Sequence, residues 1–179
     1  VKRLPRRTWT PFCPHWATGL MSCGAIPEIV GWNSMAEVLA VCISEVRGIS
    51  KHPVKEIRLI PEHGIEGDAH AGKWHRQVSL LAQESVDNLQ SKITIQLKPG
   101  DFAENILTRG IELKTLPVGT RLKVGTALGE VTQIGKECHN DCAIRQQVGD
   151  CCMPREGIFM RVLEEGRVCP GDTIEVIAP

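Results

Sequence analysis

"LPVGTRLKVGTALGEVTQIG", residues 116–135, is the stretch that decides the fold class. Apolar and polar residues alternate over 121–124, which is typical of a half-buried strand, and a second strand-like run with several aliphatic residues covers 127–134. Gly125 separates the two runs, and a Pro-Val-Gly turn precedes them. The stretch therefore predicts two short strands joined by a tight turn.

The same kind of pattern recurs along the chain. Further strands are predicted over residues 38–43, 54–60, 77–81, 105–108, 158–163 and 173–177. The last two are predicted to pair as a hairpin with its turn at 170–172. Helical spacing occurs near Ser85, with Val86, Leu89 and Ile93, and Asn140 or Asp141 can cap a short helix over 143–148. Many short strands and few helices predict a mostly β domain, a sandwich or a barrel.

Length and composition limit the class of protein. A chain of 179 residues is long enough for one domain with a core and short for two. Lysine plus arginine equals aspartate plus glutamate, so nucleic acid and anionic membranes are not favoured as partners. No apolar run approaches the roughly 20 residues that cross a bilayer. Because an adequate aliphatic core needs no disulfides, we expect the eight cysteines to belong to a cytoplasmic protein.

The first 34 residues differ from the rest of the chain. They hold three of the four tryptophans and four of the eleven prolines, and they show no clean periodicity. Prolines interrupt the apolar run that a secretory signal needs. We expect residues 1–34 to be an N-terminal extension, disordered or non-native, and residues 35–179 to form a single domain.

A glycine-rich stretch, "GIEGDAHAGKWHRQVSLL" at 64–81, is the first candidate for a binding site. Its glycines allow close backbone approach to a ligand. Its polar residues are Asp68, His70, Lys73, His75 and Arg76. A guanidinium can hold phosphate or carboxylate through two bonds, and a lysine adds a point charge. The alternative is a solvated loop with its charges outside, and the pattern is not that of a P-loop.

A second polar stretch, "KPGDFAENI" at 98–106, has the same style. Asp101 can form a turn by bonding its own backbone, which is a purely structural role. Glu104 and Asn105 stand at the entrance of a predicted strand, where side chains can line a site. Both interpretations stay open.

The third stretch, "GKECHNDCAIRQQVGDCC" at 135–152, holds four of the eight cysteines. The spacing does not match the paired ligands of a structural zinc site, because adjacent Cys151 and Cys152 would point to opposite sides of a strand. A Cys142–Cys151 disulfide and inert buried thiols are further alternatives. Cys138 differs from the others because it lies between a predicted strand and a predicted helix start. Helix N–H groups and nearby cationic residues there favour a thiolate, which suits a nucleophile, a persulfide carrier or a soft-metal ligand.

Four pieces in register carry a resemblance. They are "GIEGDAHAGKWHRQVSLL", "PGDFAENILTRGIEL", "LPVGTRLKVG" and "GKECH". Together they resemble the MOSC domain, the module found at the C-terminus of molybdenum-cofactor sulfurases and in related stand-alone proteins. The resemblance spans residues 35–179 and implies a barrel-like MOSC β-barrel with a few short helices.

The resemblance also implies a site. In cofactor-bound relatives such as the mitochondrial amidoxime-reducing component, one cysteine ligates molybdenum, and the matching position is Cys138. The phosphate and polar ring atoms of the pterin need donors, and the matching motifs offer His70, Lys73, Arg76 and Asn105. The implied function is binding of the molybdenum cofactor, molybdopterin, and small stand-alone relatives are thought to reduce N-hydroxylated compounds.

Two departures from the family keep alternatives open. The chain has no room for the pyridoxal-phosphate domain of a full sulfurase, so we expect no bound pyridoxal phosphate. Residues 1–34 are too short to replace the additional N-terminal domain that helps to hold the cofactor in the amidoxime-reducing relatives. The first alternative is a sulfur carrier that passes persulfide sulfur on Cys138 to a metal–sulfur cofactor. Its partner would be a cysteine desulfurase or a molybdoenzyme, and Cys142, Cys151 and Cys152 would be resolving or packing thiols. The second alternative is a structural zinc-binding module.

Overall fold

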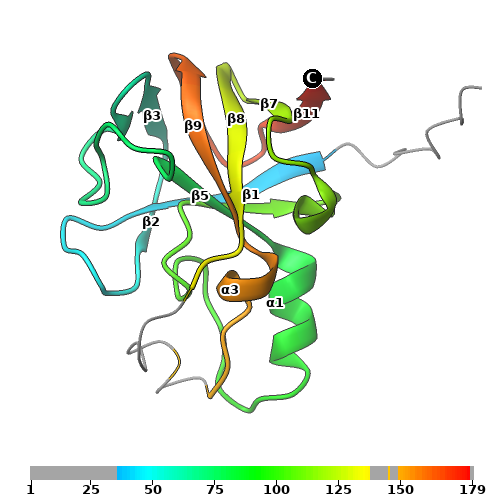
Figure 1. Cartoon of the computed structure of the whole chain (residues 1–179). Helices are drawn as coiled ribbons and strands as arrows, with labels where there is room; N and C mark the ends of the chain where they lie inside the picture. The colour runs from blue at the N-terminus through cyan, green and yellow to red at the C-terminus, as the bar shows by residue number, and fades with distance from the viewer. Residues whose placement is uncertain (1–35, 138–144, 146–148, 178–179) are drawn as a thin grey trace, which may run out of the picture. The chain divides into compact units, whose positions relative to one another are not determined.

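The computed structural model describes residues 36–137, 145 and 149–177. Within these residues, seven strands form a closed β-barrel (Figure 1). In barrel order the strands are β1 (Ala36–Ile43), β6 (Ile106–Arg109), β5 (Val78–Ala82), β9 (Ile158–Glu164), β8 (Ala127–Ile134), β7 (Arg121–Val124) and β11 (Thr173–Ile177). The barrel closes where β1 pairs with β11 in the register Ala36↔Ile174 and Glu37↔Thr173. The predicted β-barrel is therefore confirmed.

Smaller elements surround the barrel. Strand β2 (His52–Val54) extends from β1, and a separate three-stranded sheet contains β3 (Ile57–Ile60), β4 (Gly64–Ile65) and β10 (Gly166–Val168). The described residues include two short α-helices, α1 (Gln83–Gln90) and α3 (Met153–Glu156), and one 3₁₀ turn, η1 (Leu113–Thr115). Figure 1 shows α1 and α3 at the same end of the barrel.

Two apolar layers explain why these residues form a barrel capped by helices. Strand β5 is buried on both faces, and its side chains alternate between the layers. Leu80 belongs to the barrel interior with Val41 and Ile106. Leu81 belongs to the second layer with Phe102 and Phe159, and that layer also holds Val86 and Leu89 of α1. The strand thus serves as the wall between two cores.

Several predicted elements match the structure closely. The strands predicted over 121–124 and 127–134 have the observed bounds of β7 and β8. The predicted helix near Ser85 is α1, although it ends at Gln90, before Ile93. The predicted strand over 54–60 is instead two strands in different sheets, because the chain leaves β2 after Val54 and starts β3 at Ile57.

The predicted hairpin of residues 158–163 with 173–177 is wrong. Strand β9 pairs with β5 and β8, whereas β11 pairs with β1 and β7. Between them β10 leaves the barrel to pair with β3 in the other sheet. The turn itself is present, since Asp172 N donates to Cys169 O over 3.2 Å.

Some predictions fall outside the described residues. These are the extension over 1–34, the helix over 143–148, and the positions Cys138 and Cys142. In the part of the chain that the structure describes, no helix combines the length and the apolar character that crossing a membrane requires.

Candidate functional site

The carboxylate of Asp68 is the centre of a buried polar network. Its Oδ1 atom accepts the backbone N–H of His70 over 2.9 Å and lies 3.3 Å from His70 Nδ1. Its Oδ2 atom accepts from Lys51 Nζ, from Ser44 N over 3.3 Å and from Asn105 Nδ2 over 3.1 Å. One side chain therefore joins three segments that are far apart in the sequence.

The Lys51–Asp68 ion pair is almost completely removed from solvent, with each side chain 2% exposed. Burial alone would raise the pKa of Asp68, but hydrogen bonds from His70 and Lys51 hold that pKa well below its usual range. The carboxylate is therefore ionised at neutral pH. Breaking such a pair leaves one uncompensated buried charge, which typically costs about 3–5 kcal/mol.

Asn105 is fixed on all sides at the entrance of β6. Its Oδ1 atom accepts from Ser79 N over 3.2 Å and from Ser79 Oγ over 2.9 Å. Its Nδ2 atom donates to Cys42 O over 3.1 Å as well as to Asp68. The amide thus ties β5, β1 and the glycine-rich stretch together beside the barrel wall.

A hollow of about 210 Å³ lies next to this network, and Lys51, His70 and Asn105 form part of its lining. It is lined by Lys51, His70, Trp74, Arg76, Ser79, Ala103, Asn105, Lys136, Met153 and Phe159. The lining residues come from the glycine-rich stretch, the 98–106 stretch, β5, β9, the start of the segment that follows β8, the loop before β2 and α3. The hollow therefore lies where the motifs of the sequence converge.

Arg76 is the most distinctive residue of the lining. Its guanidinium carbon lies 4.9 Å from the ring centroid of Trp74 and 5.6 Å from that of Phe159. Such cation–π contacts hold the side chain in place. Its Nε atom is buried and has no hydrogen-bond partner among the described residues. Because native proteins rarely leave a buried donor unpaired, this atom indicates a missing acceptor.

The charge of the lining is positive. Lys51 is neutralised by Asp68, but Arg76 and Lys136 form no ion pair with a carboxylate in the described part of the chain. Trp74 at the rim is 38% exposed and is anchored by a hydrogen bond from its Nε1 to His70 O over 3.0 Å. The hollow can therefore take an anionic group beside an ordered aromatic surface.

Glu104 lies behind the site and does not line it. The side chain is buried, and its carboxylate accepts backbone N–H groups of Gly100 over 2.5 Å and Phe102 over 3.1 Å. Burial raises the pKa of Glu104 to about 7, although these N–H groups oppose the shift. Asp101 has the purely structural role that its turn predicts, since its Oδ2 accepts Lys98 N over 2.7 Å.

Three of the four described cysteines, Cys42, Cys151 and Cys152, are buried, and Cys169 is partly exposed. Burial raises the pKa of Cys42 to about 12, and it raises the pKa of Cys152 to the same value. Because the thiolate is the nucleophile, neither thiol is reactive near neutral pH. Both belong to the apolar layer under α1, with Cys151 beside them. No group of three or more His, Cys, Asp or Glu side chains suited to a metal ion occurs within 36–137 and 149–177.

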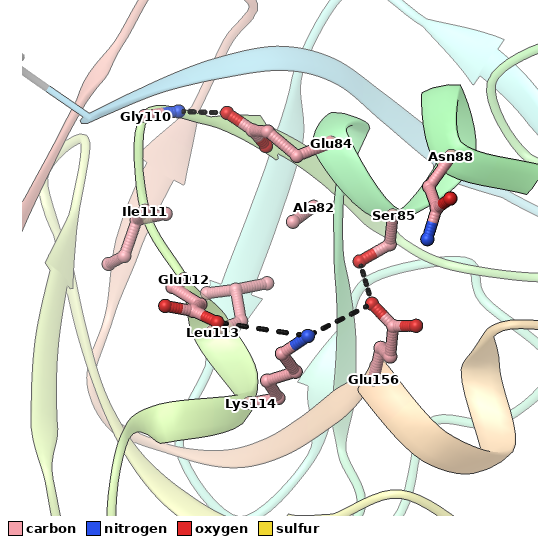
Figure 2. Close-up of a pocket in the computed structure, with 10 residues that line it drawn as sticks. All are labelled: Ala82, Glu84, Ser85, Asn88, Gly110, Ile111, Glu112, Leu113, Lys114 and Glu156. Carbon is pink, nitrogen blue, oxygen red and sulfur yellow. Dashed lines mark hydrogen bonds and ion pairs between the residues drawn. The ribbon is translucent and has the colours of Figure 1, made fainter.

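A larger hollow of about 360 Å³ lies between α1, the segment 110–114 and α3 (Figure 2). Its carboxylates are already engaged. Glu84 accepts from Gly110 N over 2.8 Å, and Glu156 accepts from Ser85 Oγ over 2.6 Å and lies 3.6 Å from Lys114 Nζ. The described lining of this larger hollow includes none of the predicted cofactor-binding residues His70, Lys73, Arg76 and Asn105. The smaller hollow is therefore the candidate site.

The structure brings together three of the predicted site residues. His70, Arg76 and Asn105 line one hollow, whereas Lys73 is exposed and is not part of its lining. Lining residues that the sequence did not predict include Trp74, Ser79, Lys136 and Phe159. The ion pair of Lys51 and Asp68 was missed as well. The only signal for them was the position of Asp68 within the glycine-rich stretch, and nothing in the sequence indicated Lys51.

The model of the MOSC domain family matches residues 67–175. The chain belongs to the MOSC domain family. The family is associated with binding of the molybdenum cofactor. The matched range contains His70, Arg76, Asn105 and Lys136, which line the hollow of this MOSC domain, and Asp68, which contacts the lining.

Relatives support the family and the fold. The uncharacterized protein YflK of Bacillus subtilis strain 168 is 26% identical over 141 residues, which cover 73% of this chain and 63% of YflK. The chain therefore matches slightly less than two thirds of that relative's length. The crystal structure of the YuaD protein of Bacillus subtilis is similar with a TM-score of 0.65 at 18% identity, covering 82% of this chain and 97% of YuaD. The crystal structure of YiiM from Geobacillus stearothermophilus is similar with a TM-score of 0.61 at 22% identity, covering 79% and 75%.

Proposed function

We propose that this MOSC domain binds the molybdenum cofactor in the hollow lined by Arg76 and Lys136, with Cys138 as the metal ligand. The observation that carries the proposal is the buried, unpartnered Nε of Arg76 in a hollow whose two unpaired charges are both positive. An anionic ligand would satisfy that donor and neutralise those charges.

The donor set fits the polar parts of a phosphorylated pterin. Arg76 and Lys136 suit the phosphate, because a guanidinium can bind it through two hydrogen bonds and an ammonium adds charge. His70, Ser79 and Asn105 offer donors and acceptors for the polar ring atoms. Lys73 is exposed, so in this proposal it contributes at the rim or not at all.

The assignment of Cys138 to this site rests on the chain itself. Lys136 lines the hollow, and Cys138 follows it by two residues. Two residues span at most about 7 Å, so the Cα atom of Cys138 stays within that distance of the Cα atom of Lys136. Thiolate sulfur is a suitable ligand for a soft metal centre.

The associated reaction is reduction of an N-hydroxylated compound to its amine, which consumes two electrons and two protons and releases water. When bound, the cofactor supplies the two-electron chemistry. His70 borders the hollow and can hold or release a proton there, and Trp74 and Phe159 exclude water from one side. The electrons come from an external donor.

A sulfur carrier is the second candidate, and one observation limits its form. The pKa of Cys152 is raised to about 12 by burial, so this thiol is a poor nucleophile toward a persulfide. A carrier would therefore hold its sulfur on Cys138 without help from Cys152. Molybdoenzymes or cysteine desulfurases would be its partners.

One preparation tests these candidates. The protein is purified anaerobically from cells that make molybdopterin, and bound metals, pterin fluorescence and the mass of the intact chain are measured. We expect molybdenum and pterin in the wild type, loss of molybdenum in Cys138→Ser, and about a tenfold lower content of both in Arg76→Ala. Loaded protein should also reduce an N-hydroxylated base with reduced methyl viologen as the electron donor.

The control variant is Arg167→Ala, which also removes an arginine. Arg167 is paired with Glu56 over 3.2 Å and is not part of the hollow, so its loss should leave the cofactor content unchanged. Wild-type protein without molybdenum and pterin contradicts the proposal. An additional sulfur on Cys138 then favours the sulfur carrier, and stoichiometric zinc favours the zinc module.

A further inference from the structure

We infer that Asp68 is a positioning residue for the anion site, although its own charge repels an anion. The inference deepens the proposed function and rests on it, because it assumes that the hollow binds an anionic group. It concerns the wall of the hollow that contains Lys51, His70 and Asn105, all of which Asp68 contacts.

Asp68 contacts three residues that line the hollow. Lys51, His70 and Asn105 all line the hollow. Asp68 contacts His70 through Oδ1, and it contacts Lys51 and Asn105 through Oδ2. The Oδ2 atom alone receives Lys51 Nζ and Asn105 Nδ2. Asp68 does not itself line the hollow, and no carboxylate does among the residues that the structure describes. Loss of Asp68 would therefore remove a bonding partner from three lining residues at once, although Asn105 would keep its bonds to Ser79 and Cys42.

Asp68 also fixes the loop over residues 44–51. Asp68 holds both of its ends, since Oδ2 accepts from Ser44 N and from Lys51 Nζ. Between these ends Arg47 Nε donates to Ala69 O over 2.8 Å, so the loop also bonds the backbone beside Asp68. Asp68 thus fixes the loop from which Lys51 reaches the hollow.

The negative charge of Asp68 gives a second expectation for the effect of its substitution on anion binding. Removing a carboxylate next to an anion site normally strengthens anion binding, because it removes repulsion. Positioning predicts the opposite, because donors that are no longer held in place must be ordered when the ligand binds. The sign of the change in affinity therefore separates a positioning role from a simple charge effect.

The experiment measures binding of inorganic phosphate to the full chain by titration calorimetry at one ionic strength. We expect Asp68→Asn to weaken binding at least tenfold, although the variant is more positive. Asp68→Glu keeps the charge and moves the carboxylate by one methylene, and we expect it to weaken binding also. Tighter or unchanged binding in both variants would overturn the inference. Because Asp68→Asn can fail to fold, Asp68→Glu alone then decides.

The matched control is Glu165→Gln, which makes the same charge change on an exposed carboxylate paired with Arg58. It should change phosphate affinity by less than twofold. If the wild type does not bind phosphate, or if Arg76→Ala leaves its affinity unchanged, the proposed anion site itself is wrong. If Arg76→Ala abolishes binding and both Asp68 variants bind as the wild type does, only the positioning role is wrong.

A spectroscopic readout distinguishes positioning from a loss of stability. The ring nitrogens of His70 report on Asp68, because Nδ1 lies 3.3 Å from Oδ1. We expect their ¹⁵N signals to shift in folded Asp68→Asn protein. The ring of His75, whose Nε2 lies 3.0 Å from Gln133 Oε1, should keep its signals and serves as the internal reference. Unchanged His70 signals would contradict the inference.

Discussion

Glu104 is a single residue whose charge the fold disfavours. The side chain is buried, and no cation among the described residues forms an ion pair with its carboxylate, which accepts from the backbone N–H groups of Gly100 and Phe102. Its pKa of about 7 lies above the ordinary value of 4.5. The folded protein therefore keeps a proton on Glu104 at pH values where the unfolded chain has released it.

The consequence is a stability that falls as pH rises. Below pH 4.5 Glu104 is protonated in both states and costs nothing, and between pH 4.5 and 7 the unfolded state gains by ionising first. The cost levels off above pH 7 at about 3 kcal/mol. We expect urea unfolding to show that Glu104→Gln is gradually stabilised relative to the wild type between pH 5 and pH 8. Parallel pH profiles of the two proteins would contradict this prediction.

Some site residues could be predicted from the local sequence pattern, and others could not. The glycine-rich stretch and the 98–106 stretch single out His70, Arg76 and Asn105, because functional polar residues near turns and strand ends leave a local pattern. Lys51 leaves none. Lysine is almost never buried unless it is paired, and its partner Asp68 lies 17 residues away on another segment. Only the fold brings the two together.

At the scale of elements, a close contact between two loops sets the position of Lys51 and Glu104. Gly100 has φ of +92°, and a Cβ atom added to it would lie 2.1 Å from Lys51 O. The backbones are also bonded, since Lys51 N donates to Gly100 O over 2.8 Å. The glycine is therefore needed both for its conformation and for the absence of a side chain.

Substitution of two glycines separates these requirements. Gly119 has φ of +96° with nothing within 4 Å of an added Cβ, so Gly119→Ala should cost only the left-handed conformation, about 1–2 kcal/mol. Gly100→Ala adds a collision with backbone and should cost about 2 kcal/mol more. Chemical denaturation measures both. An equal loss of unfolding free energy in the two variants would show that the loops around Gly100 and Lys51 can move apart without a cost in stability.

The elements that sequence reasoning predicted best are those with local signals. The two strand-like runs on either side of Gly125 predict the bounds of β7 and β8, because their pairing needs only a tight turn. The partner of β11 has no such signal. Strand β11 pairs with β1, which lies more than 130 residues earlier in the chain, so a hairpin with the nearer β9 was predicted wrongly.

At the scale of the whole molecule, the described domain is complete as a closed barrel from β1 to β11. Every barrel strand has two neighbours within residues 36–177. We therefore expect a chain without residues 1–34 to keep its melting temperature within about 3 °C, because each 1 kcal/mol shifts the midpoint by about 2–8 °C in domains of this size range. Circular dichroism melts of the two chains test this. A large fall in the midpoint would mean that the extension packs on the domain.

The seam between β1 and β11 also determines how the domain responds to force. It holds two register pairs, Ala36↔Ile174 and Glu37↔Thr173. Because the strands are antiparallel, the first residue of β1 and the last residues of β11 lie at the same end of the seam. A force applied to both ends of the domain therefore breaks the backbone hydrogen bonds between β1 and β11 one after another, and not all together. A translocating motor that pulls the chain from its ends would meet its weakest mechanical barrier at this seam.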